Sequence, residues 1–181
     1  VTCVRDFLLS PQLRHVKKYV RMGDMKVAFS SRASSSDGFE MNTEEWRQAE
    51  IPSANGHGTA AALAKLFGVL STGGERDGHK IMEPSTIELA VTPLSEGPDT
   101  VILGAPIRFG VGYGLGLGTT TIGSAPPPGR LFGHSGIGGT VAFGDPEHGL
   151  GYGFLCNRMH NPRMLYRTSN QLTKTLLEIV G

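Results

Sequence analysis

The sequence has few cysteines and almost no net charge. Two cysteines, Cys3 and Cys156, are too few for a disulfide framework, and the pair favours a reducing compartment such as the cytoplasm. Lysine and arginine number 17 against 16 aspartates and glutamates, so the formal net charge is +1. A charge this small argues against binding to nucleic acid or to a membrane surface through electrostatics.

Long apolar runs and targeting signals are also missing. No run approaches the ~18 apolar residues of a membrane-spanning helix, so we expect no membrane span. The start of the chain lacks the basic and apolar regions of a secretory signal. Because the chain begins at Val1 and not at Met, we expect a fragment, a processed product or an incomplete gene model. Its 181 residues still allow one domain with a hydrophobic core.

Motifs for metals, dinucleotides and phosphates are absent from the sequence. The six histidines are scattered, and no His-Glu-x-x-His or paired-cysteine spacing occurs. There is no Gly-x-Gly-x-x-Gly loop and no P-loop. We therefore expect no metal and no bound cofactor.

Glycine, in contrast, is abundant, with 26 residues that fall mostly in apparent strands. Between Arg108 and Gly118 glycines alternate with apolar residues, which predicts one unbroken strand with a bare face. Gly149, Gly151 and Gly153 repeat the pattern. A strand face without side chains lets another backbone or a ligand come close.

Helix signals divide the rest of the chain. Apolar spacing predicts a helix over residues 9–20, whose basic residues we interpret as a solvated face and not as a nucleic-acid patch. Thr59 is placed to cap an alanine-rich helix that ends before Gly73. Ser85 and Glu88 form a capping box, so the Ser85 hydroxyl is expected to hold a backbone N–H and to be a poor nucleophile. The other predicted helices have these bounds: Ala60–Leu70, Thr86–Val91 and Pro162–Val180.

The stretch from Arg130 to Asn157 predicts paired antiparallel strands. The polar triplet His134-Ser135-Gly136 ends the first strand, Thr140–Phe143 form the next, and Leu150–Cys156 return after a turn at Asp145–Gly149. Helices, then antiparallel strands, then a final helix indicate an α+β fold, in which an antiparallel sheet carries flanking helices.

The same stretch carries a family resemblance. Gly133-His134-Ser135-Gly136, followed by Gly138-Gly139 and, after the strands, by Asn157-Arg158-Met159, resembles the C-terminal end of the serine β-lactamase-like esterases. These are relatives of class C β-lactamases and penicillin-binding proteins. The resemblance covers residues 46–181, leaves 1–45 as a poorly matched N-terminal segment, and implies the C-terminal half of a β-lactamase/transpeptidase-like fold.

The resemblance also implies roles for four residues. His134 takes the position of the lysine in the family's Lys-Thr-Gly motif, Ser135 that of the threonine and Gly136 that of the glycine. The backbone N–H of Ile137 is the implied oxyanion donor. Histidine is only partly protonated at neutral pH, so a carboxylate-bearing β-lactam would be held less firmly than an ester-like substrate. The implied partner is a small-molecule ester or amide.

The attacking group of the family is missing from this chain. Family enzymes form an acyl-enzyme on the serine of Ser-x-x-Lys, with a tyrosine of Tyr-x-Asn or Tyr-x-Ser handling the proton. No lysine here follows a serine at that spacing, and no tyrosine opens the second motif. We therefore expect the C-terminal portion of a serine hydrolase, inactive alone. The alternative is a non-catalytic pseudoenzyme or scaffold module of the same fold.

Two other catalytic readings use residues that are present. Gly133 to Ile137 approaches Gly-x-Ser-x-Gly, but the fifth residue is Ile and the triplet leads into another strand, whereas a nucleophile elbow leads into a helix. His57, in a tight turn predicted at residues 55–59, either fixes that loop or serves catalysis.

Overall fold

The structure, a computed structural model, describes residues 43–99, 105–116, 131–136, 139–158 and 166–181. The helix predicted at residues 9–20 lies outside these ranges. In chain order, the described elements are α3 (Glu44–Gln48), α4 (Ala60–Ser71), β1 (Glu75–Arg76), β2 (His79–Lys80), α5 (Pro84–Ala90), β3 (Ser95–Asp99), β4 (Ala105–Phe109), β5 (Gly114–Leu115), β6 (Phe132–Ser135), β7 (Val141–Asp145), β8 (Leu150–Phe154) and α6 (Arg167–Val180).

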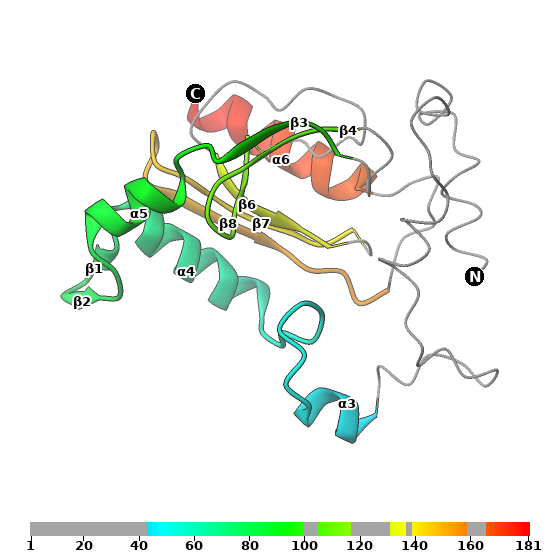
Figure 1. The fold of residues 1–181 in the computed structure, drawn as a ribbon. Coiled ribbons are helices and arrows are strands. Elements are labelled where there is room, and N and C mark those ends of the chain that lie inside the picture. Colours follow the sequence, from blue (N-terminus) through cyan, green and yellow to red (C-terminus); the bar gives the residue numbers. More distant parts are fainter. Residues whose placement is uncertain (1–42, 100–104, 117–130, 137–138, 159–165) are drawn as a thin grey trace.

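Six strands form one antiparallel sheet in the order β3-β4-β5-β6-β7-β8, and β1 pairs with β2 in a separate hairpin. The helix α4 lies against one face of the sheet and α6 against the other (Figure 1). The α+β prediction, an antiparallel sheet with flanking helices, is thereby confirmed. Within the described ranges no helix has the length and apolarity to cross a membrane.

The helix α4 forms where the sequence predicts it. The Thr59 side chain accepts a hydrogen bond from the backbone N–H of Ala62 at 3.1 Å and so caps the first turn. Beyond the last turn, Gly73 and Gly74 adopt φ angles of 88° and 86°, which glycine reaches without strain. The Gly74 N–H donates to the carbonyl of Val69 at 2.9 Å and closes the end of the helix.

The glycines of β8 let the backbone of α4 lie directly on the sheet. A Cβ built at Gly151 would overlap the Ala64 carbonyl oxygen and the backbone nitrogen of Gly68. A Cβ at Gly153 would come within 2.5 Å of the Ala60 carbonyl oxygen. The predicted close approach on this bare strand face is confirmed, and its occupant is a helix of the same chain.

Each face of the sheet has its own apolar core. The α4-side core centres on Phe132, which is 0% exposed and stacks against Phe67 with ring centroids 5.9 Å apart. The α6-side core centres on Phe143, also 0% exposed, beside Tyr152 at 4.9 Å. The buried members of the first are Phe67, Leu70, Ile87, Leu115, Phe132 and Ala142, and those of the second are Leu131, Val141 and Phe143.

The prediction of one strand from Arg108 to Gly118 is wrong. The strand β4 ends at Phe109, the chain turns, and β5 begins at Gly114, which pairs with Phe109. The turn needs glycines, because Gly112 has a φ of 78° and a Cβ at Gly110 would overlap the Ala90 carbonyl oxygen. The alternating glycines therefore belong in part to a turn, which the period-two pattern of the sequence does not predict.

The helix α5 starts earlier than the capping box implies. It begins at Pro84, with Glu83 in the capping position and no side chain capping it. Proline suits the first helical position because its fixed φ is helical and its missing N–H would have no partner there. Ser85 therefore lies within the first turn, and the argument that capping occupies its hydroxyl is wrong.

The helix α6 meets the sheet through both small polar and apolar side chains. Ser169 and Thr173 are each 1% exposed, whereas Leu172 and Ile179 are 47% and 75% exposed. The helix also meets the sheet through Leu176 and Leu177, which pack against the α6-side core. Cys156, predicted as the last residue of a strand, lies beyond the end of β8 and is partly buried.

Candidate functional site

The polar triplet His134, Ser135 and Gly136 leaves the sheet at the end of β6. This strand is held on both sides, by β5 through Gly114 and Leu115 and by β7 through Val141 to Gly144. The first half of β6 is fully buried, and the burial ends at His134, which is exposed. The triplet thus stands on a rigid, interior strand and emerges at its solvent end.

Strand alternation sends the two polar side chains of the triplet to opposite faces. His134 pairs with Ala142, which belongs to the α4-side core. Ser135 pairs with Val141, which belongs to the α6-side core. A molecule bound at the end of the strand could touch both, but each side chain has its own set of neighbours.

The imidazole of His134 folds back on the main chain. Its Nδ1 lies 2.9 Å from the Ser135 carbonyl oxygen. A carbonyl oxygen only accepts hydrogen bonds, so this contact assigns the proton to Nδ1. In the neutral form of the ring, Nε2 then carries the lone pair and can accept a hydrogen bond.

Ser135 is partly buried and meets a tyrosine from the far end of the chain. Its side chain is hydrogen-bonded to the phenol of Tyr166, the residue that precedes α6. Burial raises the pKa of Tyr166, and the Ser135 hydrogen bond opposes that rise. Tyr166 is 7% exposed, so the phenol is neutral and shielded at the inner side of the triplet.

Gly136 is required by the turn that joins β6 to β7. Its N–H donates to the Thr140 carbonyl at 2.9 Å, and its own carbonyl accepts from Gly139 at 2.9 Å. A Cβ at Gly136 would overlap the Thr140 hydroxyl oxygen. Ile137, the implied oxyanion donor, lies outside the described residues.

The other histidine candidate, His57, has an aromatic neighbour. The His57 ring contacts Trp46 edge-on, with centroids 6.0 Å apart, in the loop that follows α3. That loop has its turn at residues 52–54 and not at 55–59, because the Asn55 side chain accepts from the Ile51 N–H and donates to the Trp46 carbonyl. The loop-fixing reading of His57 agrees with this contact.

A second polar pair lies at the opposite end of β7 from the triplet. The Nδ1 of His148 is 2.7 Å from a carboxylate oxygen of Asp145, which is 3% exposed and also accepts the N–H of Glu147. This hydrogen bond raises the pKa of His148. Among the described residues, no group of three histidine, cysteine or acidic side chains could hold a metal ion.

Sequence reasoning missed Tyr166. Tyr166 is followed two positions later by Thr168, so it matches neither Tyr-x-Asn nor Tyr-x-Ser. Its contact with Ser135 spans about thirty residues of sequence, and no local pattern encodes such a contact. The one available signal was a large aromatic residue directly before an amphipathic helix.

Comparison with known proteins adds the family. The sequence matches the model described as Beta-lactamase over residues 4–174, a range that includes most of the segment that the resemblance left poorly matched. It is similar to the Esterase/beta-lactamase LipL of Mycobacterium tuberculosis (strain ATCC 25618 / H37Rv), with 36% identity over 123 residues. That alignment covers 65% of this chain and 26% of the relative.

Solved structures of other proteins share the fold of this chain. A novel penicillin-binding protein (PBP) homolog from Caulobacter crescentus superposes with a TM-score of 0.63 at 35% identity, covering 82% of this chain and 40% of that one. A family VIII carboxylesterase gives a TM-score of 0.58 at 29% identity, covering 73% of this chain and 36% of that one. EstA from Arthrobacter nitroguajacolicus Rue61a, at 21% identity and a TM-score of 0.54, shares the fold.

The chain therefore spans about a quarter of the length of its curated relative and 40% or less of these solved structures. The family model nevertheless covers almost all of it, and its fold is the one these relatives share. On this evidence the chain belongs to the beta-lactamase family.

Proposed function

We propose that this chain supplies one wall of the active site of a serine hydrolase that cleaves esters or β-lactam-like amides through an acyl-enzyme. The attacking serine and its base would come from residues outside the 181. The observation that carries the proposal is the triplet at the solvent end of an interior strand, in a chain of the beta-lactamase family. The names of the relatives, an esterase/beta-lactamase and a carboxylesterase, support the reaction class.

Each residue of the wall has a proposed part. The Ile137 N–H would donate to the oxyanion that forms when the carbonyl is attacked. Gly136, which cannot carry a side chain beside Thr140, would leave room for the substrate. His134, with Nε2 as an acceptor, would not pair with a carboxylate as a lysine does, which favours neutral esters. Hydrolysis itself needs the serine that this chain lacks.

Activity measurements test the proposal. The 181-residue chain should hydrolyse a nitrophenyl ester no faster than buffer does. The longest natural protein that contains this chain should hydrolyse the ester readily. In that longer protein, His134→Ala should lower kcat/KM by about tenfold, equivalent to ~1.4 kcal/mol of transition-state stabilisation.

His79→Ala is the matched control, since His79 is an exposed histidine on β2 and should be dispensable. Turnover by the short chain that an active-site inhibitor abolishes would contradict the proposal. Equal rates for His134→Ala and His79→Ala would show that His134 has no part in the proposed active site.

A non-catalytic module is the second candidate. The absence of Ser-x-x-Lys and Tyr-x-Asn favours it as much as it favours a separated half. The upstream reading frame discriminates between them. An intact upstream frame that contains Ser-x-x-Lys supports the enzyme. An intact frame without it supports a non-catalytic module, either a pseudoenzyme that binds a partner or a scaffold module.

A further inference from the structure

The side chain of Asn55 holds together the segment that joins α3 to α4. Its Oδ1 accepts a hydrogen bond from the Ile51 N–H at 3.1 Å. Its Nδ2 donates to the Trp46 carbonyl at 2.9 Å and also to the Ala49 carbonyl. One amide thus spends its acceptor and its donors on the backbone of a single segment, and these partners decide which end of the amide is the nitrogen.

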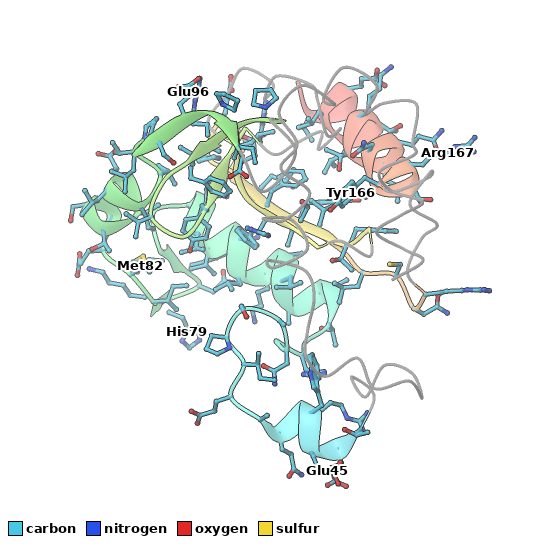
Figure 2. All side chains as sticks on the ribbon, turned by 45° about the vertical axis from the view of Figure 1, so that its right-hand side comes forward. Glu45, His79, Met82, Glu96, Tyr166 and Arg167 are labelled. Atoms are coloured by element: carbon cyan, nitrogen blue, oxygen red, sulfur yellow. The ribbon has the colours of Figure 1, made fainter. Side chains whose placement is uncertain are left out.

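These hydrogen bonds matter for α3 because the helix itself contributes no buried residue. Figures 1 and 2 show α3 apart from the sheet, with Glu45 at the outer edge of the molecule in Figure 2. Besides the Asn55 bonds, Trp46 contacts His57 edge-on, with ring centroids 6.0 Å apart. A helix of five residues is not stable alone, so loss of the Asn55 bonds would release α3 from this segment.

Asn55 is also the only asparagine in the sequence that precedes a glycine. The fold does not require glycine at position 56, because a Cβ built there meets nothing within 4 Å and Gly56 is not among the glycines with positive φ. The glycine has a chemical consequence instead. Without a side chain beside it, the Gly56 backbone nitrogen can reach the amide carbon of Asn55 when the segment opens.

We propose that Asn55–Gly56 is a deamidation site, which the folded segment protects and which local opening of the segment exposes. The Gly56 nitrogen loses its proton to a base in the solvent and attacks Cγ of Asn55, and the bond from Cγ to Nδ2 breaks. The departing nitrogen takes up a proton and leaves as ammonia, and water opens the cyclic imide to aspartate or isoaspartate. In the folded segment the amide is held on Ile51, Trp46 and Ala49, so opening must come first.

The product cannot form the same contacts again. A carboxylate only accepts hydrogen bonds, so one of its oxygens would face the carbonyls of Trp46 and Ala49, acceptor against acceptor. Isoaspartate also places an extra methylene in the turn where the Asn55 N–H donates to the Ile51 carbonyl at 3.1 Å. Deamidation would therefore release α3 for good. The inference is independent of the proposed function, since it needs neither a nucleophilic serine nor a substrate.

Peptide mapping by mass spectrometry at mildly alkaline pH tests the chemistry, read as the mass gain of the peptide that contains Asn55. The folded 181-residue chain should deamidate there about tenfold more slowly, or slower still, than the same chain unfolded in guanidinium chloride, because only the open fraction reacts. Gly56→Ala should slow the reaction of the unfolded chain by about tenfold, because the added methyl hinders the attacking nitrogen.

Equal rates in the folded and unfolded chains would overturn the protection. A Gly56→Ala rate equal to that of the wild type would overturn the assigned attack.

The fluorescence of Trp46, the one tryptophan in the sequence, tests the release of α3. Asn55→Asp creates the product side chain directly and should shift the Trp46 emission to longer wavelength, because the ring loses His57 and gains contact with water. Asn157→Asp is the matched control, since Asn157 is exposed and its variant adds the same charge outside this segment. Gly56→Ala should also keep the wild-type emission.

An unchanged emission in Asn55→Asp, or an equal shift in Asn157→Asp, would overturn the inference. The far-UV circular dichroism of Asn55→Asp should stay close to that of the wild type, because both apolar cores lie on the sheet and not on α3. A global loss of structure in Asn55→Asp would contradict a release that is confined to α3.

Discussion

Single residues determine what the end of β6 can offer. The Nδ1 of His134 lies 2.9 Å from the Ser135 carbonyl oxygen, and a hydrogen bond with Ser135 opposes the rise that burial causes in the pKa of Tyr166. Gly136 keeps the space beside Thr140 free of a side chain. Each of these effects comes from one or two atoms, so conservative substitutions that remove only those atoms are the informative ones.

The pair of Asp145 and His148 makes stability depend on pH. The hydrogen bond to the Asp145 carboxylate, and then the charges of Asp145 and Glu147, raise the pKa of His148 in the folded state. A group with a raised folded pKa stabilises the fold fully below its unfolded pKa of about 6.5 and loses that contribution as the pH rises through the folded value.

Urea unfolding of His148→Gln and wild type should therefore differ most at about pH 5.5 and least at about pH 8.5. His79→Gln, at an exposed site on β2, should show no such trend. A difference for His148→Gln that grows toward high pH would contradict the assigned ion pair.

At the scale of elements, the contact between α4 and β8 sets how far the helix stands from the sheet. Gly151→Ala should destabilise the fold by about 2–3 kcal/mol, because the new methyl overlaps backbone atoms of Ala64 and Gly68 that cannot rotate away. Gly58→Ala, where nothing lies within 4 Å of the added Cβ, should change stability by no more than about 0.5 kcal/mol. Chemical denaturation measures both, and an unaffected Gly151→Ala would contradict the close packing.

Elements with local signals were predictable, and elements decided by distant contacts were not. Thr59 and the alanines define α4 within one turn of sequence, and the structure agrees. The alternating glycines after Arg108 fit a strand or a turn equally well, and the turn is held by contacts with a distant segment, among them the Val111 N–H donating to the Ala90 carbonyl. On α6, Leu176 and Leu177 pack against the core, whereas the full burial of Ser169 and Thr173 has no signal in the apolar periodicity.

The candidate site shows the same division. The triplet was found from its motif, and the structure adds its place at the end of an interior strand. Tyr166 was not found, because its contact with Ser135 joins two segments that are close only after folding.

At the scale of the whole molecule, the chain is short relative to the proteins it resembles. It covers 40% of the solved penicillin-binding protein homolog, and Leu89, Leu94 and Val111 are each more than half exposed. We propose that the remainder of such a fold provides the attacking serine. The sheet and both its helix layers would then serve to hold one polar strand end opposite that serine.

Labelling with a serine-directed fluorophosphonate, read by intact mass and peptide mapping, tests this account most directly. The 181-residue chain should remain unlabelled, and the longest natural chain should carry one adduct on a serine outside residues 1–181. An adduct on Ser135, or on any other serine within the 181 residues, would show that the nucleophile is present here and would contradict the account.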